Sequence, residues 1–225
     1  MNFTVEYANR PEQREGTHLV LMLHGYGANE RDLLQVGQMI GGPITYAGLR
    51  APQPVGTPLT DIEDTAVVPV AAFGYQWYPL TPDIRSDVRA VGLATDYVIE
   101  FLEQEGTKYE SVSLLGFSQG MAVATSVARR RPELVKAIVG FSGFTIGGAG
   151  DLFDDEAFAA AKLPVFYGRG DADQVVPAQL AERSEQWLRE HSEIEVHVYP
   201  GMQHAICPEE INDAAAFVKR HILDS

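Results

Sequence analysis

The sequence predicts an α/β domain built on a mostly parallel β-sheet with helices on both faces. Short apolar segments of strand length alternate along the chain with longer segments whose apolar residues recur at helical spacing. The strand segments are apolar at nearly every position, as expected of strands that are covered on both faces. A length of 225 residues suits one large domain of this class. We therefore expect a single domain over residues 1–225.

The N-terminal part supplies the first strands and helices. Residues 18–23 form an unbroken apolar run that stops at the turn-forming sequence HGYGAN, which predicts a buried strand followed by a loop. Helical spacing over residues 30–40 ends at a glycine pair, and a second strand is expected near residues 45–49. Residues 51–82 hold many of the prolines and show no helical or alternating period, which indicates an ordered, functional loop.

The same alternation continues to the C-terminus. Ser86 is placed to cap a helix that runs to about residue 104. The further expected elements are strand 111–115, helix 119–130, strand 137–142, helix 156–161, strand 163–168, helix 177–190, strand 194–199 and helix 208–222. No repeat or linker interrupts them, in agreement with one domain.

Composition and charge narrow the classes of partner. Apolar residues make up 45% of the chain and charged residues 21%, which is the balance of an ordinary folded domain. Seventeen Lys and Arg against 31 Asp and Glu give a net charge of −14. This charge repels phosphate backbones and anionic membrane surfaces. We expect no nucleic-acid partner and no stable membrane association.

The first residues and the single cysteine bear on where the protein is located and on its cysteine chemistry. The first residues contain neither the basic nor the apolar segment of a secretory signal, and no apolar run approaches the roughly 18 residues that span a bilayer. We therefore expect a cytoplasmic protein. Cys207 is the only cysteine, so neither an intrachain disulfide nor a CxxC metal site can form.

Residues 116–120, Gly-Phe-Ser-Gln-Gly, form a G-x-S-x-G motif between an expected strand and an expected helix. In this setting a sharp, strained turn exposes a serine nucleophile, and a side chain at either glycine would crowd the turn. Ser118 is the candidate nucleophile. Ser142 also ends a strand, but it lacks the second glycine and no expected helix follows it directly, so we interpret it as a structural turn.

A serine nucleophile needs a base, and in hydrolases of this type the chain order is serine, acid, histidine. Of the late histidines, only His204 falls in a loop, directly after the strand expected at residues 194–199. That position is the carboxyl edge of the sheet, where open α/β sheets assemble their sites. The acid should lie on the loop after the preceding strand, where Asp171 and Asp173 both occur. Spacing alone does not choose between them.

A tetrahedral oxyanion requires backbone N–H donors, usually one from the residue after the nucleophile and one from an earlier loop. Gln119 supplies the first amide. The HGYGAN loop is a source of the second, because Gly25 and Gly27 permit an unusual backbone path and Tyr26 presents its amide. His24 is then a structural residue.

These pieces together resemble the phospholipase/carboxylesterase family of α/β-hydrolases, which includes bacterial carboxylesterases and acyl-protein thioesterases. The resemblance covers nearly the whole chain and rests on six segments in order: LHGYGANERDL, RAPQPV, YQWYPL, LGFSQGM, GDADQVVP and PGMQH. It implies the α/β-hydrolase fold and selects Asp173 as the acid. It also implies that Tyr26 and Gln119 donate the oxyanion amides and that Trp77 lines the acyl site.

Several residues retain a second interpretation. Trp77, with its aromatic neighbour Tyr78, equally fits a role as a core anchor, because aromatic side chains more often fill interiors than contact ligands. Cys207 fits a small packing residue beside the site. Arg169 and Gln203 stand where relatives often carry histidine and glycine, and these differences concern local substrate contacts.

The sequence therefore predicts a serine hydrolase that cleaves carboxylic esters with small to medium acyl chains through an acyl-enzyme. Ser118, Asp173 and His204 form the predicted triad. A thioesterase or lysophospholipase with the same triad is an alternative, and a non-catalytic binding protein of the same fold is a rival of another class. The expected partner is a small-molecule ester or thioester, and no metal ion or organic cofactor is implied.

Overall fold

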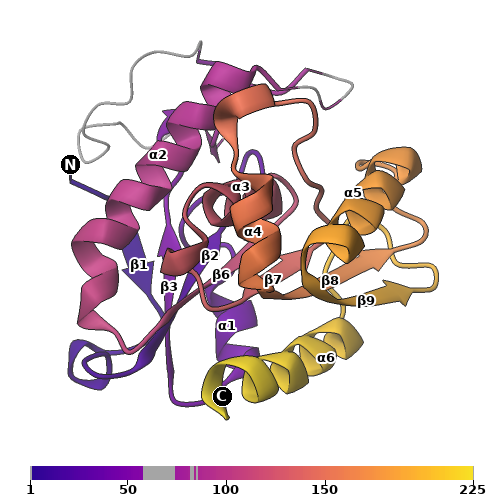
Figure 1. Cartoon of the computed structure of the whole chain (residues 1–225). Helices are drawn as coiled ribbons and strands as arrows, with labels where there is room; N and C mark the ends of the chain where they lie inside the picture. The colour runs from indigo at the N-terminus through magenta and orange to yellow at the C-terminus, as the bar shows by residue number, and fades with distance from the viewer. Residues whose placement is uncertain (1, 58–73, 82–83, 85, 225) are drawn as a thin grey trace.

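The computed structural model describes residues 2–57, 74–81, 84 and 86–224. Within them, seven strands form one sheet in the order β1-β3-β2-β6-β7-β8-β9 (Figure 1). The mutually parallel strands are β2 (His18–Leu23), β3 (Ile44–Leu49), β6 (Val112–Phe117), β7 (Ile138–Phe141), β8 (Pro164–Gly170) and β9 (Glu193–Tyr199). Strand β1 (Val5–Tyr7) joins the edge antiparallel to β3. The predicted fold class is confirmed.

Helices cover both faces of this sheet. One face carries α2 (Val88–Glu105), α3 (Gln119–Arg130), α4 (Asp155–Ala161) and α5 (Ala178–His191), and the other carries α1 (Leu34–Ile40) and α6 (Pro208–Val218) (Figure 1). A short π-helix, Lys219–Leu223, extends α6. The result is a three-layer arrangement in which the strands lie between two helical layers.

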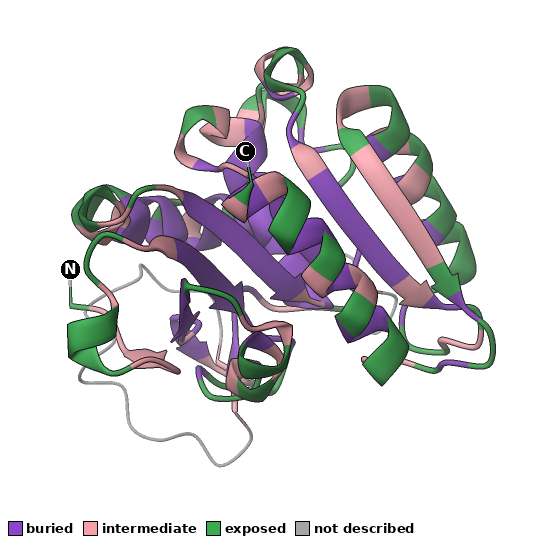
Figure 2. Ribbon diagram, turned by 90° about the horizontal axis from the view of Figure 1, so that it is seen from below, coloured by how far each residue is buried: buried purple, intermediate pink, exposed green. Residues whose placement is uncertain are grey.

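Each face of the sheet has its own apolar core, and the strand period of two explains which residue joins which core. In β2, Leu19, Leu21 and Leu23 belong to the core under α2 to α5, whereas Val20 and Met22 belong to the core under α1 and α6. Figure 2 shows the inner strands buried along their length, while the edge strand β9 is only partly buried. The middle of the sheet is therefore more deeply buried than this edge.

Local signals misplaced a few boundaries. Strand β1 was not predicted, because three residues are too short to show an alternating pattern. The helix expected from residue 30 begins at Leu34. Helix α2 is capped by Asp87 and not by the predicted Ser86: Asp87 has extended backbone angles, and its Oδ1 accepts a hydrogen bond from Ala90 N at 3.0 Å.

The proline-rich loop expected over residues 51–82 is described in part. Strands β4 (Gln53–Pro54) and β5 (Tyr75–Gln76) pair antiparallel within it. Residues 58–73 and 82 lie outside the described residues. The described part is ordered by this pairing and by an isolated bridge between Ala28 and Tyr75.

The sheet topology locates the crevice where a ligand can bind. The chain moves from β2 outward to β3 and then returns to β6 on the other side of β2. The carboxyl ends of β2 and β6 therefore flank a topological switch point, which is where open α/β sheets bind ligands. Tyr26 follows β2 and Ser118 follows β6, while Asp173 and His204 follow the parallel strands β8 and β9 at the same edge.

Candidate active site

Ser118 occupies a strained turn between β6 and α3. Its backbone has φ 53° and ψ −117°, a conformation that side-chain-bearing residues rarely adopt. Its N–H donates to Phe141 O at 2.9 Å, which ties the turn to the neighbouring strand. A Cβ at Gly120 would overlap the Leu23 carbonyl, and one at Gly116 would overlap the Gly120 backbone. Both glycines of the motif are thus required by close backbone packing.

Asp173 and His204 are in direct contact. Asp173 Oδ2 lies 2.8 Å from His204 Nδ1. The other carboxylate oxygen, Oδ1, accepts from the backbone N–H groups of Val175 at 2.7 Å and Val176 at 3.0 Å. These bonds explain the sequence Asp-Gln-Val-Val, because the turn after Asp173 fixes the carboxylate toward the imidazole. With Nδ1–H donating to Asp173, His204 Nε2 is the basic nitrogen.

Asp171, the second candidate acid, has a different partner. Its Oδ1 accepts from Gly201 N at 2.6 Å, and its own N–H donates to Tyr199 O at 3.3 Å. Asp171 therefore joins the loop after β8 to the loop that precedes His204. The structure brings Asp173, and not Asp171, to the imidazole.

The loop that carries His204 lies beside the nucleophile turn. The rings of Phe117 and His204 are 4.9 Å apart between centroids, so the imidazole lies next to the residue before Ser118. Among the described residues the Ser118 hydroxyl makes no hydrogen bond to His204 or to the start of α3. Catalytic hydrogen bonds are often long without substrate and tighten when it binds.

The two predicted oxyanion donors have backbone N–H groups with no acceptor among the described residues. Gln119 is the first residue of α3, where helical N–H groups have no partner within the helix. On the other loop, Gly27 N donates to Tyr75 O at 2.9 Å and Ala28 N to Gly25 O at 3.2 Å, while the N–H of Tyr26 between them is unused. Both amides are thus available to an incoming oxygen.

His24 precedes this loop and has a structural environment. It is 1% exposed, its Nδ1 lies 2.7 Å from Gly25 O, and its Nε2 accepts from Ala51 N at 3.1 Å. Burial lowers the pKa of His24 to about 4, so the imidazole is neutral near pH 7. This bonding uses both ring nitrogens and supports the structural role expected for His24.

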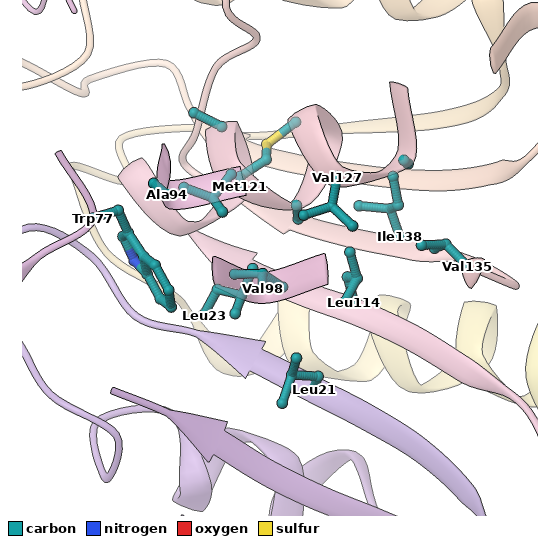
Figure 3. Close-up of a cluster of buried hydrophobic side chains, with 14 of the residues drawn as sticks. Leu21, Leu23, Trp77, Ala94, Val98, Leu114, Met121, Val127, Val135 and Ile138 are labelled. Carbon is teal, nitrogen blue, oxygen red and sulfur yellow. The ribbon is translucent and has the colours of Figure 1, made fainter. Parts of the chain in front are cut away.

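Trp77 lies inside the larger core. Figure 3 shows its ring among buried side chains that include Leu23, Ala94 and Val98, and the residue is completely buried. Its indole Nε1 donates to His24 O at 2.8 Å. These are the contacts of a core anchor, and the predicted contact with an acyl group stays a prediction.

Two charged residues near the site were missed by the sequence reasoning. Arg50 Nε and Nη2 donate to the two carboxylate oxygens of Glu30, each at 2.7 Å, and both side chains are largely buried. The only signal was a charge in each of two motifs, GANERDL and RAPQPV, that follow buried strands. The pair ties the end of the loop after β2 to the end of β3.

The remaining polar candidates have structural partners. Cys207 caps α6, with its Sγ 3.5 Å from Glu210 N. Ser142 Oγ donates to Ala205 O at 3.1 Å, and Arg169 pairs with Glu185 at 3.1 Å. Within the described part of the chain, no group of three or more His, Cys, Asp or Glu could hold a metal ion, and no helix is long and apolar enough to cross a bilayer.

A cavity of about 650 Å³ lies at the start of α5. Its lining comes mainly from the segment after β7, including Phe144 and Ile146, and from the first turns of α5, including Pro177 and Leu180. None of the predicted triad or oxyanion residues lines it.

Comparison with known sequences identifies relatives. Residues 5–222 match the protein-family model described as Phospholipase/Carboxylesterase. Acyl-protein thioesterase 1 of Saccharomyces cerevisiae is 36% identical over 121 residues, which cover 52% of this chain and 53% of the yeast protein. The match thus spans about half the length of that relative. Acyl-protein thioesterase 1 of Mycosarcoma maydis is 26% identical over 226 residues, with 92% of each chain covered.

Solved structures show the same architecture. The crystal structure of esterase PE8 superposes with a TM-score of 0.73 at 25% identity, covering 99% of this chain and 100% of the other. Zea mays acyl-protein thioesterase 2 gives a TM-score of 0.72 at 19% identity over 97% and 98% of the two chains, which shows a shared fold. Since the family match extends over nearly the whole chain, this protein belongs to the phospholipase/carboxylesterase family of hydrolases.

Proposed function

We propose that this protein is a serine hydrolase that cleaves carboxylic esters with small to medium acyl chains. Ser118 is the nucleophile, His204 the base and Asp173 the orienting acid. The observation that carries the proposal is the 2.8 Å contact between Asp173 and His204 at the sheet edge, beside the strained turn of Ser118. Family membership supports the reaction class.

The mechanism is a two-step acyl transfer. His204 Nε2 takes the proton of the Ser118 hydroxyl as the oxygen attacks the substrate carbonyl, and the leaving alcohol receives that proton. The Tyr26 and Gln119 amides stabilise the oxyanion. Asp173 stays ionised and stabilises the imidazolium, and water then hydrolyses the acyl-enzyme by the same route.

The small to medium acyl chain length in this proposal comes from the resemblance of the six sequence segments to carboxylesterases. The cavity of about 650 Å³ does not bear on it, because none of the proposed triad or oxyanion residues lines that cavity. A series of acyl chain lengths therefore tests this part of the proposal.

A thioesterase reaction is the second candidate, and the names of the relatives favour it. Two of them are acyl-protein thioesterases of fungi. The same triad and oxyanion donors serve a thioester, because the tetrahedral intermediate has the same oxyanion and the leaving thiolate needs less protonation. Rates on matched oxygen esters and thioesters of one acyl group would separate these candidates.

The test is steady-state hydrolysis of p-nitrophenyl esters from acetate to palmitate by the wild type and by Ser118→Ala. We expect Ser118→Ala to lower kcat by about 10⁴-fold or more. Ser142→Ala is a matched control, since Ser142 also has a positive φ of 45° at a strand end and its hydroxyl has only a structural hydrogen bond.

Equal activity in the wild type and Ser118→Ala would contradict the proposal. Absence of turnover on every ester and thioester, together with no labelling of the wild type by a fluorophosphonate, would instead support the non-catalytic binding protein. A chain-length optimum at or below medium acyl groups is the expected result, and an optimum at palmitate would contradict the proposed preference for small to medium acyl chains.

A further inference from the structure

The two proposed oxyanion donors belong to different parts of the fold. Tyr26 lies on the loop after β2, and Gln119 begins α3. Both N–H groups must lie about 2.7–3.1 Å from one oxygen for the oxyanion to be stabilised. The contacts that fix these two elements relative to each other therefore determine how well the oxyanion is held.

Segment 75–78, the YQWY of the sequence, contacts the loop that carries Tyr26 through its backbone and through one indole. Gly27 N donates to Tyr75 O, and Tyr75 N donates to Ala28 O, each at 2.9 Å. The indole Nε1 of Trp77 donates to the carbonyl of His24 at 2.8 Å. The segment thus holds the loop on both sides of Tyr26.

The same segment is bound to α3 by the side chain of Gln119. Gln119 Oε1 accepts from Trp77 N at 3.1 Å, and Gln119 Nε2 donates to Tyr78 O at 2.8 Å. All three residues are completely buried. The carboxamide therefore satisfies one backbone donor and one backbone acceptor that have no access to water.

The close approach of this segment to the loop depends on a glycine. Gly74 has φ +73°, and a Cβ at this position would overlap the Gly27 carbonyl. The bridge between the segment and the loop is thus set by backbone contact, with no side chain between the two. Because the two backbones are in direct contact, a shift of the segment would shift the loop with it.

We propose that segment 75–78 is a strut that sets the separation of the Tyr26 and Gln119 amides. The Gln119 carboxamide and Trp77 are its two attachment points, and both are positioning residues. Gln119 thus has two roles, with its backbone N–H facing the oxyanion and its side chain fixing the distance to the other donor. This inference rests on the proposed function, because it assigns a role within that oxyanion site.

Substitutions in a segment that positions the amides should have different effects from substitutions in an ordinary core contact. Loss of core packing lowers stability, whereas displacement of the oxyanion amides lowers transition-state stabilisation with little change in ground-state binding. A trifluoromethyl ketone reports the second effect directly. Its carbonyl carbon bonds to Ser118 Oγ, the hydroxyl proton passes to His204, and the carbonyl oxygen becomes an oxyanion facing the two amides.

The experiment compares Gln119→Met and Trp77→Phe with Thr95→Val. Gln119→Met keeps the backbone N–H but removes both hydrogen bonds to the segment. Trp77→Phe removes the bond to His24 O together with part of the buried ring. Thr95→Val is the control, because Thr95 is also completely buried, but its Oγ1 donates to Val91 O at 2.7 Å within α2, outside the segment and α3.

We expect Gln119→Met to lower kcat by about 10- to 100-fold with KM changed less than about threefold. Inhibition by the trifluoromethyl ketone should weaken by the same factor as kcat. Trp77→Phe should show the same pattern with a smaller loss. Thr95→Val should keep both quantities within about threefold of the wild type.

Two results would overturn the strut. One is wild-type kcat and ketone affinity in folded Gln119→Met or, if that variant does not fold, in Trp77→Phe. The other is an equal loss in Thr95→Val. Failure of the proposed function has a separate signature, because wild-type esterase activity would then survive in Ser118→Ala whatever the strut variants do.

Discussion

The two halves of the proposed active site use polar groups in different ways. The oxyanion half contains loop 24–30, the end of β3, segment 75–78 and the start of α3, and the acid–base half contains loops 171–176 and 200–207 with the start of α6. In the oxyanion half, Glu30 is buried but has a bidentate partner in Arg50. In the acid–base half, Glu210 is buried and neither of its carboxylate oxygens has a hydrogen-bond partner among the described residues.

The pKa values of these two carboxyl groups differ accordingly. Burial favours a higher pKa for Glu30, but the hydrogen bonds and charge of Arg50 outweigh it, so the pKa of Glu30 is lowered. For Glu210, burial raises the pKa to about 8. The backbone of Cys207 lowers this pKa by a smaller amount, and the negative charge of Asp213 raises it further. The carboxyl of Glu210 is therefore largely protonated near pH 7.

We therefore expect substitutions in the two halves to affect stability and activity differently. In the oxyanion half, the buried side chains of Glu30, Trp77 and Gln119 each have a hydrogen-bond partner, so removal of one partner leaves another group unpaired. The buried Tyr78 hydroxyl is an exception and has no partner among the described residues.

The acid–base half has one short contact between loops, from Asp173 to His204, and the unpaired carboxyl of Glu210. In the acid–base half, replacing Glu210 by its neutral amide should raise stability, because a buried carboxylate without a partner is costly. Replacing Asp173 by its amide should instead abolish the proposed reaction.

The largest effect is expected at the acid. Asp173→Asn should lower kcat on p-nitrophenyl esters by about 10⁴-fold, because the imidazole loses its orienting carboxylate and its correct tautomer. Asp171→Asn is the matched control on the same loop, and its carboxylate bonds only to Gly201 N among the side-chain contacts of the described residues. We expect it to stay within about tenfold of wild type. A larger loss in Asp171→Asn than in Asp173→Asn would reverse the assignment.

The second effect concerns stability in the oxyanion half. Arg50→Met leaves the buried carboxylate of Glu30 without its partner, so the free energy of unfolding should fall by about 3–5 kcal/mol in urea titrations. Arg31→Met is the control, since Arg31 pairs with Glu6 at 3.4 Å on the surface, and its loss should cost less than about 1 kcal/mol.

Removal of both charges would sharpen the interpretation of that pair. If the stability loss comes from the unpaired buried carboxylate, Arg50→Met combined with Glu30→Leu should recover much of the stability lost by Arg50→Met alone. Equal stability of Arg50→Met and the wild type would contradict this expectation for the oxyanion half.

The smallest effect is a pH-dependent gain in the acid–base half. The Glu210 carboxyl loses its proton near its ordinary value of 4.5 in the unfolded chain and near 8 in the folded chain. The folded state binds the extra proton between these values, so wild-type stability falls as pH rises through that window. Glu210→Gln removes this fall, and its advantage should grow by about 1.4 kcal/mol per pH unit, to about 3 kcal/mol at pH 7.

Urea titrations from pH 4.5 to 8 measure this gain as the difference between Glu210→Gln and the wild type. Glu209→Gln is the control, because Glu209 is an exposed carboxyl in the same first turn of α6. Parallel pH curves for Glu210→Gln and the wild type would show that Glu210 is ionised in the folded protein and would contradict the comparison of the two halves.

Much of the fold was predictable from the sequence. Apolar runs of strand length separated by helical periods depend on neighbours a few residues apart, so the alternation and the parallel sheet could be inferred, and both are confirmed. The candidate serine and histidine were also local inferences, since Ser118 lies in a glycine-bounded turn after a strand and His204 is the one late histidine expected in a loop.

Tertiary structure decided the features that depend on residues far apart in the chain. Spacing left Asp171 and Asp173 equivalent, and only the folded loops show which carboxylate lies against the imidazole. Gln119 bonds to segment 75–78, about forty positions away in the chain. Glu30, in the loop after β2, pairs with Arg50, which directly follows β3. The sequence by itself determined the elements and the chemical groups, because these follow from short-range patterns. Which groups are buried, paired or left unpaired depends on how the loops at the sheet edge pack together.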